Sequence, residues 1–236
     1  ILVSFGNPDR GKSLLKLANS FIKKIKGNAS ITVMHLSPTN ELNHYNLVEY
    51  EKTCFEPIIQ ESENLNQKIT TLFKASNDID TEITDVANKG DYDLLLIGIG
   101  KSIFDGSLLG RILGFTTRII NPENLINQVT GKENLFENSP FDDRTKNIII
   151  KSKVPVGILI DKDFSSTETV FIPIYSENDT FLIQFAQKLI HNSESQITLL
   201  DMAGLIKKNP ELKEKIRAIE QQAPNHINLF NEKNID

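Results

Sequence analysis

Cysteine is almost absent from this chain of 236 residues: only Cys54 is present, so no internal disulfide can form. That usage fits a reducing compartment, where structural disulfides are rare. Cys54 shares an apolar helical face with Phe55, Ile58 and Ile59. We therefore predict that its thiol is a buried packing group and not a reactive one.

Long apolar runs, a signal peptide and a basic stripe are also missing. No run approaches the ~20 residues that a membrane-spanning helix needs. Lysine and arginine are dispersed and the formal net charge is −5, which argues against a nucleic-acid surface. The four histidines are scattered without metal-ligand spacing (His35, His44, His191 and His226), and they predict no metal site. No catalytic set is recognisable, so we expect a protein that is not an enzyme.

What is present is an internal repeat. Residues 1–35 and 170–202 both begin with a short apolar strand, ILVSF or VFIPI, which leads through a polar loop into an amphipathic helix. A second strand follows in each copy, ITVMHL or ITLLDM, and a third strand matches Leu72-Phe73 to Leu229-Phe230. A repeated β-α-β-α-β unit predicts parallel sheets. The second copy stops just past its third strand and the chain begins inside a strand, so we expect a piece of a longer protein.

The first copy is complete enough to predict a fold class. Strands are expected at 1–5, 31–36, 69–75, 92–98 and 154–161, with helices between them, the first at 12–26. The runs DLLLIGIG and VPVGILID are almost wholly apolar, which is typical of strands covered by helices on both faces. The predicted fold is therefore α/β, with a parallel five-stranded sheet, followed by a truncated repeat of the same unit.

Domain boundaries follow from the same pattern. We predict one domain at 1–161 with an insertion at about 101–141, a polar, serine-rich linker at 162–168, and an incomplete second copy at 169–236. Within the long connection, Asn121-Pro122 has the pattern of a helix start. Ser139, followed by Asp142, is expected to cap a last helix that runs to Lys151.

A phosphate-loop pattern follows the first strand. The residues Gly6-Asn7-Pro8-Asp9-Arg10-Gly11-Lys12-Ser13 match G-x-x-x-x-G-K-[ST] in every position. In a true P-loop, backbone N–H groups cradle phosphates, while the lysine and serine bind the outer phosphates and magnesium. The matching loop at 175–181 in the second copy has no glycine and no lysine. A P-loop phosphohydrolase is thus one alternative, and a simple turn shaped by Gly6 and Pro8 is the other.

The order of these segments resembles the universal stress protein family. The resemblance rests on ILVSF, on TVMHL, on ITDVA followed by DYDLLLIG, and on RTKNIIIKSKVPV. It implies strand order 3-2-1-4-5, with ligands at the carboxyl ends of strands 1 and 4. In nucleotide-binding members, adenine lies near the loop after strand 1, which here holds Asn7 and Asp9. The phosphates lie after strand 4, where this sequence has Gly98, Gly100, Lys101 and Ser102.

This sequence departs from the family's phosphate motif in two places. Lys101 stands where the second glycine is expected, and Asp142-Asp143 replaces the closing Gly-Ser. Two carboxylates repel a phosphate, so tight binding of ATP in the family manner is not expected. An adenine nucleotide is the one cofactor that the resemblance suggests.

The insertion resembles the cytosolic tails of bacterial monovalent cation/proton antiporters, from Gly106 to Thr117 and on through Asn121-Pro122-Glu123. That resemblance implies a cytoplasmic regulatory module tethered to the inner membrane by an antiporter domain of the same polypeptide; the alternative is a free-standing, nucleotide-binding universal stress protein. The insertion is rich in large apolar residues that predict an interface (Leu108, Leu109, Ile112, Leu113 and Phe115). Together with an exposed edge strand at 154–161, it predicts a homodimer.

Overall fold

The computed structural model describes residues 1–25, 27, 29–42, 46–99, 117–122, 141–161, 164–202 and 204–231. The chain divides into two compact units. Unit 1 comprises Ile1–Asn19 and Ala29–Ser165, and unit 2 comprises Ser20–Asn28 and Ser166–Asp236. No helix among the described residues is long and apolar enough to span a membrane.

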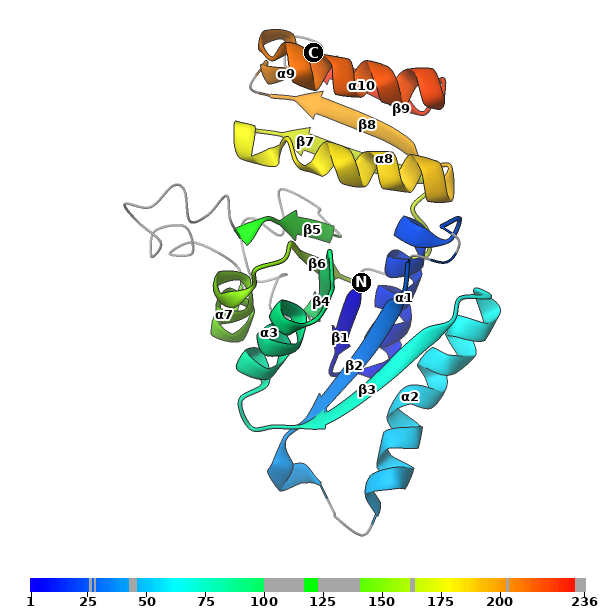
Figure 1. Ribbon diagram of the computed structural model, residues 1–236, viewed down its shortest axis with the longest axis vertical. Helices are drawn as coiled ribbons and strands as arrows, with labels where there is room; N and C mark the ends of the chain where they lie inside the picture. Colours follow the sequence, from blue (N-terminus) through cyan, green and yellow to red (C-terminus); the bar gives the residue numbers. More distant parts are fainter. Residues whose placement is uncertain are drawn as a thin grey trace. The chain divides into compact units, whose positions relative to one another are not determined.

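Unit 1 contains a six-stranded sheet of order β3-β2-β1-β4-β6-β5 (Figure 1). Five strands run parallel, and β5 runs antiparallel to β6. The strands are β1 (Leu2–Phe5), β2 (Ile31–Ser37), β3 (Ile69–Ala75), β4 (Leu95–Ile99), β5 (Thr117–Ile120) and β6 (Val156–Ile160). The helices are α1 (Pro8–Ile22), α2 (Leu47–Asn64), α3 (Ile79–Lys89) and α7 (Asp143–Lys151), with the short η1 (Thr39–Glu41).

The α/β class and the order of the five parallel strands are confirmed, but the sheet has one more strand than the sequence predicted. β5 comes from the insertion and pairs along the outer edge of β6, with Arg118 opposite Ile158. The prediction that 154–161 is an exposed edge strand, available for dimerisation, is therefore wrong. The outer edge of β6 is occupied by β5, which supplies the N–H and C=O partners that β6 lacks on that side.

Two helix starts also differ from expectation. The first helix begins at Pro8 and not at Lys12. The last helix of unit 1 is capped by Asp142, whose Oδ1 accepts a hydrogen bond from the Thr145 amide at 2.8 Å, so the cap is not Ser139. In α3 the same role falls to Asp78, which accepts from the Thr81 amide at 3.3 Å. These carboxylates satisfy orphan helix N–H groups.

One face of the unit 1 sheet packs against α3 and α7. Leu2 and Met34 on the sheet are fully buried in one core cluster with Ile83 of α3 and Ile149 of α7. The opposite face lies against α1 and α2 (Figure 1). Each fully buried aliphatic side chain contributes roughly 1.5–3 kcal/mol, and these layers account for the long apolar runs in β4 and β6.

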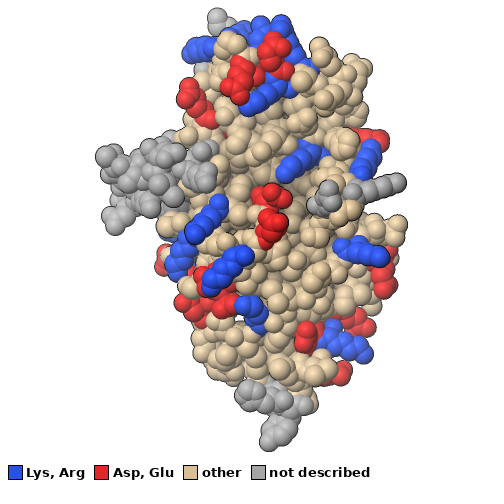
Figure 2. Space-filling model, viewed as in Figure 1, with Lys and Arg blue, Asp and Glu red and all other residues tan. Residues whose placement is uncertain are grey.

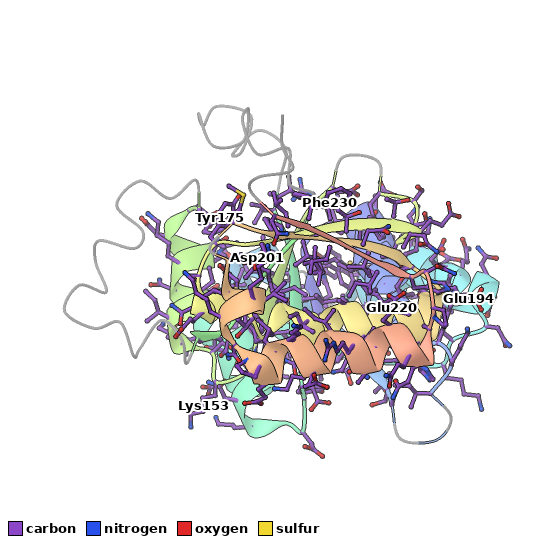
Figure 3. The ribbon with its side chains drawn as sticks, turned by 90° about the horizontal axis from the view of Figure 1, so that it is seen from above. Lys153, Tyr175, Glu194, Asp201, Glu220 and Phe230 are labelled. Atoms are coloured by element: carbon purple, nitrogen blue, oxygen red, sulfur yellow. The ribbon has the colours of Figure 1, made fainter. Side chains whose placement is uncertain are left out.

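Unit 2 is a three-stranded parallel sheet of order β7-β8-β9, with the element order of the first half of unit 1. Its elements are β7 (Thr169–Ile174), η3 (Glu177–Asp179), α8 (Leu182–Ser193), β8 (Gln196–Asp201), α9 (Leu205–Lys208), α10 (Pro210–Gln222) and β9 (Ile227–Asn231). Helices α8 and α10 lie on the same side of the strands (Figure 3).

Strand register corrects the alignment of the two copies by one residue. Met34 pairs with Leu72 in unit 1, and Leu200 pairs with Phe230 in unit 2. Because Met34 and Leu200 hold the same place in their strands, Phe230 corresponds to Leu72 and not to Phe73. A shift of one residue moves every side chain of the third strand to the other face.

Candidate ligand-binding site

The strand order reverses between β1 and β4, because the chain builds outward from β1 to β3 on one side and from β4 to β6 on the other. In open α/β sheets, ligands bind at this point, outside the carboxyl ends of the strands. The described part of this site is the turn after β1, the end of β4 and the end of β2. Gly100, Lys101 and Ser102 lie outside the described residues, and so do the predicted interface residues of the insertion (Leu108, Leu109, Ile112, Leu113 and Phe115).

The polar residues after β1 bind to their own helix. The Asn7 Oδ1 atom accepts hydrogen bonds from the amides of Asp9, at 2.8 Å, and Arg10, at 3.4 Å. Asp9 in turn lies 2.8 Å from the Lys12 ammonium. The hydrogen bond to Asp9 and its negative charge raise the pKa of Lys12. Asn7 thus acts as the N-cap of α1, and Asp9 holds Lys12 along the first turns.

The backbone at Gly6 is open to its surroundings. A Cβ atom added at Gly6 would have no heavy atom within 4 Å. At the end of β4, a Cβ atom at Gly98 would lie 3.5 Å from Leu14 Cδ1 and 3.7 Å from the Cβ and Cδ atoms of Arg10. The stem of Arg10 therefore lies over Gly98 at the switch point. Apart from its place in the phosphate-loop pattern, Arg10 was not identifiable as a site residue from the sequence.

The phosphate-loop pattern does not form a phosphate loop. Because α1 begins at Pro8, Gly11, Lys12 and Ser13 lie inside the helix, and the Gly11 amide donates to the Asn7 carbonyl at 3.0 Å. A Cβ atom at Gly11 would lie 2.6 Å from Ile58 Cδ1, so this glycine allows α1 to approach α2. The backbone N–H groups that would cradle a phosphate are engaged in the helix.

Ser13 does contact the acidic residue that follows β6. Its hydroxyl donates to Asp161 Oδ2 at 2.7 Å, and Asp161 Oδ1 accepts from the Phe164 amide at 3.0 Å. A serine next to an aspartate at a strand end is also found in magnesium-dependent P-loops. Here, however, Lys12 is paired with Asp9 and the loop is helical. The contact ties α1 to the carboxyl end of β6.

A buried histidine at the end of β2 is the feature that sequence reasoning missed. His35 is 4% exposed and lies among four aromatic rings from β1, α2 and β3, with centroids 5.0 to 6.4 Å away (Phe5, Tyr50, Phe55 and Phe73). Burial lowers the pKa of His35, against a smaller opposing effect of its hydrogen bond to the Phe5 carbonyl. The ring is therefore a neutral part of the core.

Cys54 lies in the same layer, beside Tyr50. It is a free, buried cysteine, as the sequence predicted, and burial raises the pKa of its thiol. The Tyr50 hydroxyl lies 3.2 Å from the Ser37 hydroxyl. A thiol with a raised pKa is a weak nucleophile, which agrees with a packing role for Cys54.

Charge and metal-binding groups are dispersed over the described part of the chain. In the view of Figure 2, lysine and arginine alternate with aspartate and glutamate and form no continuous basic stripe. Within those same residues, no group of three or more His, Cys, Asp or Glu side chains could hold a metal ion. Asp142 caps α7, and the neighbouring Asp143 lies 3.8 Å from Lys146, so this acidic pair is accounted for by the helix start.

The fold has a counterpart among solved structures. The chain is similar to the crystal structure of a universal stress protein from Archaeoglobus fulgidus DSM 4304, with a TM-score of 0.50 and 13% sequence identity over 97% of this chain and 76% of that chain. At that identity the likeness shows the fold alone, which is that of a universal stress protein. No protein-family model matches this chain, and no curated protein does so either.

Proposed function

We propose that this chain is a regulatory module of the universal-stress type that acts on the cytosolic side of a membrane sodium or potassium/proton antiporter. In this proposal the module biases transport through dimerisation and through a small ligand, an adenine nucleotide being the first candidate. Two features support it: the universal-stress fold, and the resemblance of residues 106–123 to antiporter tails. The module would then be cytoplasmic and tethered to the inner membrane by the antiporter.

One observation favours a regulatory role over an enzymatic one. The polar side chains at the switch point are paired with other groups of the same chain. Asn7 caps α1, Lys12 binds Asp9, and Ser13 donates to Asp161. A catalytic acid, base or nucleophile must be free to reach a substrate. In the described part of the site these groups hold α1 in place, which suits a module that binds and transmits.

Two measurements test the antiporter proposal. The reading frame upstream of Ile1 should encode ten or more apolar segments; a start methionine directly before Ile1 would reject the proposal. In everted membrane vesicles, cation-driven proton release by the intact transporter should change when the region equivalent to residues 1–236 is deleted. A truncated transporter with an unchanged cation dependence and unchanged maximal rate would also count against it.

The second candidate is a free-standing universal stress protein that binds a nucleotide. It is favoured by the open space beside Gly6 and by Arg10 lying over Gly98. Calorimetric titration with ATP is expected to give weak or no binding, because Asp142 and Asp143 replace the family's Gly-Ser. Low-micromolar affinity would instead support this candidate. In that event, loss of binding in Lys101→Ala but not in Lys12→Ala would place the nucleotide after strand 4.

A further inference from the structure

Unit 2 has a groove between helices α8 and α10. The two helices lie next to each other on one side of the strands (Figure 3), and residues of both line a space of about 500 Å³. The apolar lining comes from Phe181 and Ile183 at the start of α8 and from Ile219 of α10. A space of this size lies within the ~300–1,000 Å³ that is typical of small-molecule sites.

The two helices correspond to α1 and α2 of unit 1. The apolar residues of α8 follow those of α1 without a gap, so Gln184 holds the place of Lys16. The strand that follows places α10, because α2 and α10 end at the same distance before β3 and β9. Ile219 therefore holds the place of Glu61.

In unit 1 the corresponding helices are joined across this position. The Lys16 ammonium lies 3.7 Å from Glu61 Oε1, so an ion pair spans α1 and α2. Gln184 and Ile219 cannot form that pair, and both of them line the groove. The groove is thus a difference between the two copies that their own side chains produce.

Helices that follow the third strand do not cover this side of the sheet in unit 1. There α3 and α7 pack on one face, and α1 and α2 lie on the opposite face (Figure 1). The same arrangement around β7–β9 would leave the side of α8 and α10 as it is. A stable protein interface takes about 20–30 residues from each partner, whereas eight residues line the groove. A small molecule is therefore the occupant that the groove can enclose.

The polar residues of the groove favour a ligand with one negative charge. Lys215 is the one charged residue among the described residues that line it, and no aspartate or glutamate is in that set. The Lys215 ammonium lies 2.8 Å from Glu211, one turn earlier on α10. An ammonium has three donors, so it can bind an anion as well. The side-chain amides of Gln184 and Gln187 supply further donors.

We propose that the groove between α8 and α10 binds a small amphipathic carboxylate. Its apolar body lies against Phe181, Ile183 and Ile219, and its carboxylate accepts hydrogen bonds from Lys215. This site is separate from the switch point of unit 1, and the inference does not rest on the antiporter proposal. For an open groove with a single charged contact, a dissociation constant on the order of 10–100 µM is expected for an aromatic ligand.

The probe for the groove is 8-anilinonaphthalene-1-sulfonate, an aromatic anion whose fluorescence rises in apolar surroundings. Titrated into the full chain, it should bind saturably and one-to-one, and sodium octanoate should displace it. Gln184→Lys with Ile219→Glu introduces the ion pair of unit 1 across the groove and should weaken binding at least ~10-fold. If this double variant unfolds by circular dichroism, Ala218→Phe takes its place, because Ala218 is exposed and lines the groove.

A charge reversal tests the carboxylate contact. Lys215→Glu should weaken binding of the sulfonate probe at least ~10-fold and should leave binding of the uncharged N-phenyl-1-naphthylamine unchanged. Lys207→Glu is the matched control, because it makes the same charge change on the exposed face of α9 and should affect neither probe. The site is overturned if the sulfonate does not bind saturably, or if neither groove-closing variant weakens it. Equal loss of both probes in Lys215→Glu would overturn the assignment of an anionic ligand.

Discussion

The Nδ1 atom of His35 lies 3.1 Å from the carbonyl oxygen of Phe5, on the neighbouring strand. Because a carbonyl only accepts hydrogen bonds, Nδ1 carries the proton and Nε2 is left as an acceptor. Nε2 is buried and has no hydrogen-bond partner within the described part of the chain. The neutral ring thus fits its aromatic surroundings, and a second proton on Nε2 would put an unpaired charge among them.

Acid should therefore destabilise unit 1 through His35. Its pKa is lowered in the folded chain, so below the unfolded value of about 6.5 the unfolded chain binds more protons. The free energy of unfolding is unaffected by His35 above that pH, and it falls as the pH drops toward the folded pKa, by up to about 1.4 kcal/mol per pH unit. His35→Phe removes this component, which thermal unfolding from pH 7.5 to 5 would measure.

The control for this pH dependence is His191→Gln, since His191 is exposed on α8. It should keep the wild-type dependence of melting temperature on pH. An identical dependence in wild type and His35→Phe would show that acid acts on other groups. In an NMR titration, the resonances of His35 should stay those of a neutral ring below the ordinary histidine pKa of about 6.5.

Gly11 should be required for packing rather than for phosphate. A Cβ atom at this position would lie 2.6 Å from Ile58 Cδ1 and 3.1 Å from the Phe5 ring. We expect Gly11→Ala to cost about 1–3 kcal/mol through overpacking, in spite of a gain in helix propensity of up to about 1 kcal/mol. Chemical denaturation gives the change in the free energy of unfolding.

A double variant distinguishes this steric cause from any other. Ile58→Val removes the Cδ1 atom that the new methyl group would meet. In the Gly11→Ala, Ile58→Val chain the total loss should be smaller than the sum of the two single losses, because the substitutions share one contact. Additive losses, or a Gly11→Ala chain as stable as wild type, would refute the packing role.

Strands with a local apolar pattern were predicted from the sequence, and a strand defined only by its pairing was not. β4 and β6 were predictable because apolar runs such as 95–99 and 156–160 reflect burial on both faces. β5 was not, because Thr117–Ile120 is short and contains Arg118, and only its pairing with β6 makes it a strand. Tertiary pairing of that kind leaves no local pattern.

The candidate site was less predictable than the fold. Asn7-Pro8 is a regular N-cap and first-position proline, and this signal was present but competed with the phosphate-loop pattern. The surroundings of His35 could not be predicted from the sequence, because its neighbours Phe5, Tyr50 and Phe73 come from three distant parts of the chain. The local sequence around a single histidine in a strand does not indicate which residues contact its ring.

Asp201 should stabilise unit 2 as a buried cap. It is 1% exposed, and its two carboxylate oxygens accept hydrogen bonds from the amides of Leu205 and Ile206, both at 2.9 Å. Asp201→Ala leaves these two donors unsatisfied and should cost about 2–4 kcal/mol. Hydrogen exchange should then be faster at both amides.

The matched control for Asp201 is Asn209, whose side chain accepts from the Leu212 amide at 3.1 Å at the start of α10. Asn209→Ala should cost about 1 kcal/mol and should leave exchange at the Ile206 amide unchanged relative to the stability of the unit. Asp201→Asn retains one acceptor oxygen, so its loss should lie between those of wild type and Asp201→Ala. Equal protection at Leu205 and Ile206 in all variants would rule out the cap.

Asn7 should behave as a helix cap and not as a ligand contact. Its Oδ1 atom accepts from the Asp9 and Arg10 amides, so Asn7→Ala should lower the free energy of unfolding by about 1 kcal/mol. Asn7→Asp retains the acceptor, and its negative charge suits the helix N-terminus although Asp9 is near, so stability should stay within about 0.5 kcal/mol of wild type. Denaturant titration of the two variants measures the difference. If Asn7 instead contacted a nucleotide through its amide, ATP affinity would fall in both variants while stability stayed equal, and that outcome would return Asn7 to the binding site.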